Sequence, residues 1–154
     1  MAYCEYNHTQ KGIIRPILWA VAVVFIVVAC VSRESPPLVV MFLAAVICVF
    51  VSCFFGTLTV RDGGDRLAVC FGPLSGFKKT ILYADITEVE RDRSTFLGGW
   101  GIHWTPKGWL WNIGGFDCVR ITAGGRSTLI GTDDPDGLVA FLLSRLGKNG
   151  KDHG

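Results

Sequence analysis

A few polar side chains in this sequence have the types and spacing that catalysis or metal binding would need. Residues 133–136 include three aspartates, and carboxylates are the ligands that hard divalent cations prefer. His103, with Asp85 or Asp117, would supply a general base and a carboxylate to orient it. The sequence contains no P-loop, G-x-S-x-G, H-E-x-x-H or dinucleotide fingerprint. We therefore expect no catalytic residues, no metal site and no cofactor, and keep an enzyme of unknown reaction as the least favoured alternative.

The same aspartates have a structural interpretation as the start of a helix. Asp133 or Asp134 is a good N-cap, and Pro135 suits the first helical position. An apolar stripe at helical spacing follows, made of Leu138, Phe141, Leu142 and Leu146. We predict a helix over about 135–146, followed by a flexible tail, 148–154.

The densest feature of the sequence is a cluster of large aromatic side chains within twelve residues: Trp100, Trp104, Trp109 and Trp111. If residues 105–108 form a four-residue turn, Trp104 faces Trp109 and Ile102 faces Trp111 across a hairpin. Side chains two residues apart then share one face of the sheet. That face either belongs to the core or forms an aromatic docking surface for a peptide or for the bilayer interface.

Three further residues are candidates for binding. Phe96 lies in an apolar, glycine-rich segment next to the tryptophans, which favours a contact role. Lys78 and Lys79 form one of the few local basic groups, and we expect them to be weakly attracted to an anionic membrane leaflet. Specific recognition of a phospholipid headgroup would need more uncompensated cations than this.

Composition divides the chain into two chemically different parts. Half of the 154 residues are hydrophobic, and only three of the residues 13–55 are charged. An uninterrupted apolar run over 16–31 extends to 13–31 when Arg15 is counted as a snorkelling residue, and a second run covers 38–55. Both approach the length of a bilayer-spanning helix, and a short polar connection joins them. We predict a transmembrane α-helical hairpin.

The net charge of +2 is too small and dispersed for nucleic-acid binding.

Basic residues near the ends of the apolar runs predict the orientation of the hairpin. Lys11 and Arg15 precede the first run, and Arg61 and Arg66 follow the second. We expect a multi-pass protein of the cell inner (cytoplasmic) membrane, with the N-terminal tail, 1–12, and the C-terminus both cytoplasmic. Its expected partners are the lipid bilayer and an unknown membrane or cytoplasmic protein, and a homo-oligomer is left open.

The six cysteines do not form a disulfide or metal framework, because none is spaced as C-x-x-C or as a Cys/His ligand set. Cys30 follows small residues as in a lipoprotein processing box, so lipidation there is an alternative to a plain membrane cysteine. Cys70 and Cys118 are expected to be small buried thiols.

From residue 56 to 147 the sequence reads as short strands separated by turns, which is typical of an antiparallel barrel or sandwich. The predicted strands are 57–61, 66–71, 77–82, 86–93, 101–104, 109–113, 118–122 and 126–131. About seven antiparallel strands closed by one C-terminal α-helix match a mainly-β barrel of the pleckstrin-homology (PH-like) type.

Four short segments carry a resemblance to a known family: 67–73, 100–102, 108–112 and 131–135. They resemble a family of small uncharacterised bacterial membrane proteins in which two transmembrane helices precede a bacterial PH-like domain. The resemblance implies the fold and brings no catalytic residues.

We therefore expect a membrane-anchored PH-like binding or scaffold module that presents its domain to a protein partner. The alternative is a membrane-anchored domain that interacts with lipid at the cytoplasmic leaflet.

Overall fold

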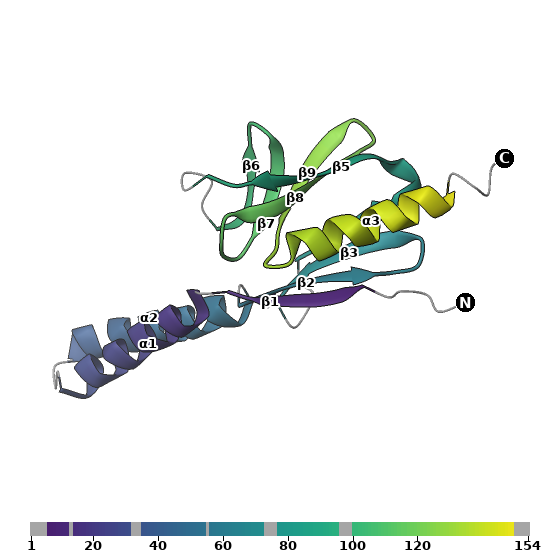
Figure 1. Cartoon of the computed structure of the whole chain (residues 1–154). Helices are drawn as coiled ribbons and strands as arrows, with labels where there is room; N and C mark the ends of the chain where they lie inside the picture. The colour runs from purple at the N-terminus through teal and green to yellow at the C-terminus, as the bar shows by residue number, and fades with distance from the viewer. Residues whose placement is uncertain are drawn as a thin grey trace.

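The structure, a computed structural model, describes residues 6–12, 14–31, 35–54, 56–72, 77–95 and 100–149. Two helices form a hairpin that projects from a β-rich body, and a third helix lies along that body (Figure 1). The elements are β1 (Asn7–Lys11), α1 (Ile14–Val31), α2 (Ser35–Phe54), β2 (Thr57–Asp62), β3 (Arg66–Phe71), β4 (Phe77–Leu82), η1 (Tyr83–Asp85), β5 (Ile86–Arg93), β6 (Gly101–Thr105), β7 (Gly108–Asn112), β8 (Asp117–Ala123), β9 (Arg126–Gly131) and α3 (Pro135–Asn149).

The strands form two separate sheets, so the predicted single PH-like barrel is wrong. The first sheet has the antiparallel order β1-β2-β3-β4, and the second has the order β5-β8-β9-β7-β6. The short 3-10 turn η1 follows β4, and the next strand, β5, pairs with β8 instead of β4. Within the second sheet β7 and β9 run parallel, whereas all other pairs are antiparallel. The described strands therefore make two open sheets rather than one closed barrel.

The strand positions themselves follow the sequence closely. Strands β3, β4, β5 and β9 begin and end at the predicted residues, and the other predicted strands differ by one residue at one end or at both ends. Helix α3 begins at Pro135, as predicted, because Asp134 Oδ1 accepts a hydrogen bond from the Gly137 N–H at 3.0 Å. Local capping and alternation therefore determine where these elements lie.

The first strand, β1, was not expected, since its sequence lies in the segment taken for an N-terminal tail. It pairs with β2 from Asn7 opposite Arg61 to Lys11 opposite Thr57. Only Gln10 of this strand is buried, and the Thr9 and Thr59 hydroxyls are 2.9 Å apart. A polar strand at a sheet edge has no apolar alternation by which the sequence could reveal it.

The prediction of a transmembrane hairpin is also wrong: among the described residues, no helix is both long enough and apolar enough to cross a membrane. Arg15 shortens the uncharged run of α1, and α2 begins with Ser-Pro-Pro, so the apolar stretch of each helix is shorter than the helix. This finding overturns the transmembrane helices 13–31 and 38–55. The multi-pass inner-membrane location, with its cytoplasmic termini, is overturned with them.

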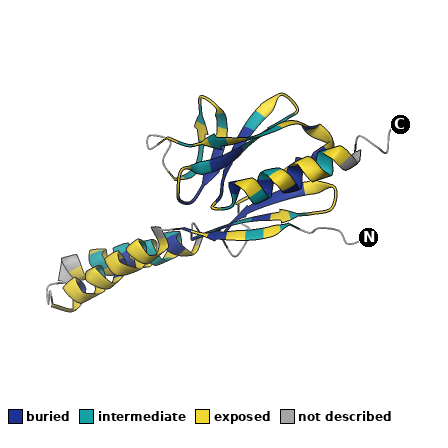
Figure 2. Ribbon diagram, viewed as in Figure 1, coloured by how far each residue is buried: buried dark blue, intermediate teal, exposed yellow. Residues whose placement is uncertain are grey.

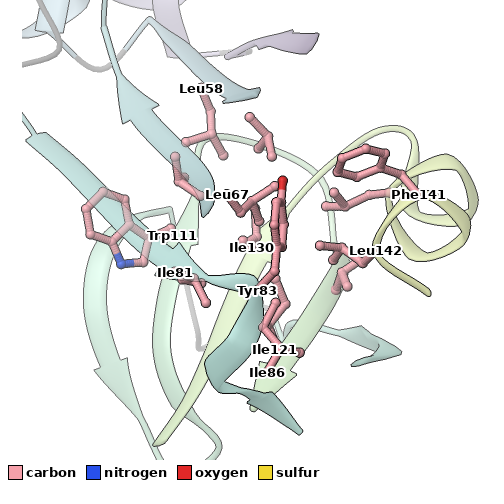
Figure 3. Packing of buried hydrophobic residues seen from close by; sticks show 14 of the residues in the cluster. Leu58, Leu67, Ile81, Tyr83, Ile86, Trp111, Ile121, Ile130, Phe141 and Leu142 are labelled. Atoms are coloured by element: carbon pink, nitrogen blue, oxygen red, sulfur yellow. The ribbon is translucent and has the colours of Figure 1, made fainter. Parts of the chain in front are cut away.

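The hydrophobic core lies between the two sheets and beneath α3, as the dark blue inner surfaces in Figure 2 show. Figure 3 shows side chains from both sheets, η1 and α3 meeting there, among them Leu58, Leu67, Tyr83, Ile121, Ile130, Phe141 and Leu142. Three of the four residues in the predicted apolar stripe of α3 are buried in this core, and Leu146 packs against its margin. The core thus joins both sheets through the helix.

An almost fully buried carboxylate, Asp62, connects α3 to the first sheet. It forms an ion pair with Arg145 of α3 and accepts hydrogen bonds from the Tyr83 hydroxyl, at 2.9 Å, and the Gly64 N–H, at 2.8 Å. The Arg145 guanidinium also lies over the rings of Tyr83 and Phe141, 5.8 and 5.5 Å from their centroids. The Asp62 carboxylate is therefore held by partners from the β2–β3 turn, η1 and α3 together.

Replacing Asp62 with Asn should destabilise the fold strongly, because it leaves the guanidinium of Arg145 without its anion in a mostly buried place. Losing one partner of such a pair costs about 3–5 kcal/mol. Urea unfolding of the full chain, followed by circular dichroism, measures the change. Asp65→Asn is the matched control, because Asp65 lies in the same turn and pairs with exposed Arg66. Equal unfolding midpoints for the two variants would contradict this assignment.

Candidate binding surface

The hairpin β6–β7 is built around a tight turn at Pro106 and Lys107. The Thr105 hydroxyl donates a hydrogen bond to the Gly108 carbonyl at 2.8 Å. Gly108 has a φ of 126°, and a Cβ there would lie 2.2 Å from the carbonyl oxygen of Ser127 on β9. Only glycine fits this position, and the close approach fixes the hairpin against β9.

The register of the hairpin confirms the predicted facing pairs. Trp104 lies opposite Trp109, and Ile102 lies opposite Trp111. Burial then separates the two ends of this face. Trp111 is 8% exposed and packs against Phe71, with ring centroids 5.8 Å apart, whereas Trp104 and Trp109 are 66% and 47% exposed. The aromatic face is therefore core at its inner end and surface at its outer end.

Trp100 lies at the other end of β6 from Trp104, with half-buried Ile102 between them. It precedes β6 directly and is 46% exposed. We call the facing pair Trp104 and Trp109 the aromatic patch. Strand β6 is also the last strand in the order of its sheet, so in the described part of the chain no strand pairs with its outer edge. The aromatic patch therefore stands beside a strand edge with free backbone groups.

A small pocket of about 190 Å³ lies beside the turn of the hairpin. Its wall consists of Arg93, Ser94, Thr95, Thr105, Pro106, Lys107, Leu110 and Leu129. Leu110 and Leu129 belong to a second buried cluster with Cys118, which is separate from the main core. The Lys107 ammonium donates a hydrogen bond to Asp92 at 2.7 Å, and this contact raises the pKa of Lys107. The one cation from the turn is thus already paired.

Cys118 is fully buried, in agreement with the expectation of small buried thiols. Burial, and then the nearby negative charge of Asp92, raise the pKa of its thiol to about 11. The thiolate is the nucleophile in cysteine chemistry, so a raised pKa removes the reactive species at neutral pH. Cys70 is buried as well.

Cys118 should therefore resist alkylation in the folded protein. We expect iodoacetamide at pH 8 to leave this thiol unlabelled in the native full chain and to label it fully in urea, as measured by mass spectrometry of its peptide. Because the folded pKa lies above the usual value of 9.0, native labelling should rise only as the pH increases toward 11. Native labelling at pH 8 that is as fast as in urea would contradict this expectation.

The other candidate binding residues lie elsewhere. Lys78 and Lys79 are on β4, at the edge of the first sheet, and no described hydrogen bond or ion pair joins them to the aromatic patch. Burial, and then the charge of Arg126, lower the pKa of Lys79. Phe96 lies outside the described residues.

The three aspartates before and within α3 have separate structural roles. Asp134 caps the helix, Asp133 pairs with His8 of β1, and Asp136 pairs with Arg91 at 2.9 Å. In the described part of the chain, no group of three or more His, Cys, Asp or Glu side chains is arranged to hold a metal ion. These contacts hold the start of α3 against β1 and β5.

The catalytic alternative required His103 to meet Asp85 or Asp117. His103 is a half-buried residue of β6, and no described hydrogen bond or ion pair joins it to either aspartate. Asp117 lies instead 3.7 Å from Arg91 and 3.5 Å from Arg93. The described residues thus do not assemble this pair.

Sequence reasoning missed the outer edge of β6 and the pocket beside the turn. Edge position depends on strand order, and the parallel pairing of β7 with β9 has no local sequence signal. The pocket is lined by residues from four separate segments of the chain.

The sequence matches no known protein-family model, and no characterised protein matches it at a significant level. The resemblance to membrane proteins with a PH-like domain stays a prediction.

Proposed function

We propose that this protein is a non-catalytic binding module whose aromatic patch contacts an extended segment of a protein partner. The observation that supports this most directly is the Trp104–Trp109 pair, two large rings opposite each other with about half or more of their surface exposed. A partner that covers rings of this size removes a large apolar surface from water. Trp is also enriched among the residues that dominate binding energies.

The strand edge beside the aromatic patch favours an extended partner. A peptide that pairs with β6 would gain main-chain hydrogen bonds along the five residues Gly101–Thr105. Side chains that alternate along such a peptide would meet Trp104 on one face of the sheet. The rigid turn at Gly108 holds the rings in place before binding, which lowers the entropic cost of association.

The lipid alternative depends on Lys78 and Lys79 and stays a prediction. Those residues lie on the other sheet from the aromatic patch, and burial lowers the pKa of the Lys79 ammonium.

A peptide library displayed on phage and selected on the full chain alone tests the proposal. We expect the selected peptides to bind the Trp104→Ala and Trp109→Ala variants at least about tenfold more weakly, which corresponds to about 1.4 kcal/mol. Loss of the cross-strand pair should reduce stability by only about 0.2–1 kcal/mol. Circular dichroism checks that each variant is folded.

Leu143→Ala is the matched control for this experiment, because Leu143 is an exposed apolar residue on α3. It should leave peptide affinity unchanged. If the peptide pairs with β6, N-methylation of a peptide nitrogen that faces β6 should weaken binding, and N-methylation of the next nitrogen along the peptide should not. Equal affinity for wild type and both tryptophan variants would refute the proposal.

A further inference from the structure

The hairpin of α1 and α2 presents an apolar surface that the rest of the described chain leaves uncovered. Seventeen of the twenty-four large hydrophobic residues that are exposed in the described structure belong to these two helices. Figure 2 shows the hairpin in yellow along most of its length, away from the buried surfaces of the β-rich body. Helices that are hydrophobic on all sides need a further covering surface.

The two helices meet along a narrow seam of mostly small side chains. The less exposed positions of α1 are spaced four, three and four residues apart, and in α2, where Ala44, Val49 and Val51 are also only partly exposed, four positions repeat this spacing. They are Leu18, Ala22, Phe25 and Ala29 in α1, and Met41, Ala45, Cys48 and Ser52 in α2. This heptad spacing is typical of helices that pack side by side. The small residues lie inside and most large ones outside, so each helix keeps most of its apolar surface for another contact.

The size of the exposed surface fits an interface between proteins. The transfer free energy of a large apolar side chain, divided by the free energy per unit area, gives its full surface. Seventeen such side chains, each about half exposed, leave on the order of 1,000 Å² uncovered. A stable interface buries about 800 Å² on each partner, and the largest apolar patch of an ordinary monomer is about 300–600 Å². Summed over all of its sides, the hairpin therefore exposes about as much apolar area as one partner buries in a stable interface.

We propose that a second copy of this chain covers the hairpin, and that two hairpins pack together as a four-helix bundle. Arg15, at the base of α1, is the only charged residue of these two helices, so two copies can approach along the hairpin without placing like charges in contact. Identical surfaces related by a two-fold axis are the commonest arrangement of soluble oligomers.

One side of the hairpin is better suited to this contact than the other. By helical spacing, Val21, Val24 and Val28 of α1 form one stripe, and Val40, Ala44, Ile47 and Val51 of α2 form the corresponding stripe beside the seam. Branched and small side chains lose little rotamer freedom on packing, and they make a flat surface. The opposite side includes the bulkier Trp19 and Phe42. The valine-rich side is the assigned contact face.

Two matched pairs of neighbouring valines test this assignment in the full chain. Val24 and Val40, on the contact face, are 58% and 64% exposed, and Val23 and Val39, on the other side, are 55% and 64% exposed. The double variants Val24→Glu/Val40→Glu and Val23→Glu/Val39→Glu therefore remove equal hydrophobicity from the two sides. Circular dichroism and the thermal transition of each variant establish that it folds.

Sedimentation equilibrium of the purified chain should give twice the monomer mass for the wild type. The Val24→Glu/Val40→Glu variant should be monomeric at the same concentration, whereas the Val23→Glu/Val39→Glu variant should stay dimeric. A monomeric wild type would overturn the proposal, and so would equal loss of dimer in both variants. Flotation with phosphatidylcholine vesicles is the second measurement. Wild type that floats with the vesicles as a monomer, with both double variants losing flotation equally, would show that lipid covers the hairpin instead.

This test is independent of the proposed function. Failure of the dimer would leave the aromatic patch and its peptide contacts unaffected, because that patch lies on the second sheet and not on the hairpin (Figure 1).

Discussion

The ion pair between Asp62 and Arg145 is the contact on which the arrangement of the body depends. It joins the end of β2 to the last turns of α3, and the Tyr83 hydroxyl brings η1 to the same carboxylate. Burying both charges carries a desolvation penalty, which is offset only when the geometry and the extra hydrogen bonds are good. This network therefore favours one position of α3 over others in which the same apolar stripe would also be buried.

Fixing α3 also fixes the relation between the two sheets. The helix covers side chains from both sheets. Asp133, just before the helix, pairs with His8 of β1, and Asp136 in its first turn pairs with Arg91 of β5. With the second sheet held in this way, the parallel pairing of β7 and β9 places the β6–β7 hairpin at its edge. The exposure of Trp104 is therefore a consequence of strand order, and not of the hairpin sequence alone.

Much of the local structure could be predicted from the sequence, because its determinants are local. The capping residue Asp134 and the first-turn Pro135 determine the start of α3, and the turn at Pro106 and Lys107 determines which tryptophans face each other. The pairing of sheets could not be predicted in this way. An order of strands is decided by contacts between distant segments, and the alternation of β8 or β9 is the same in a barrel and in an open sheet.

The aromatic face shows why residue type and spacing predicted a candidate site without deciding its role. Period-two alternation places Trp109 and Trp111 on the same face of β7, and the sequence therefore assigns both to core or both to surface. The structure separates them because the main core ends between the two residues. Trp111 packs against Phe71 of the first sheet, whereas Trp109 is 47% exposed. Where a core ends depends on the extent of the opposite layer.

The same reasoning applies to the helical hairpin, at a larger scale. Composition shows that α1 and α2 are apolar on nearly every side, and burial shows that each helix covers only a narrow seam of the other. The area left over is what a second molecule must cover, whatever that molecule is. A composition predicts that a covering surface exists. The side on which it lies follows from the shapes of the outward residues, and those differ between the valine-rich side and the side of Trp19 and Phe42.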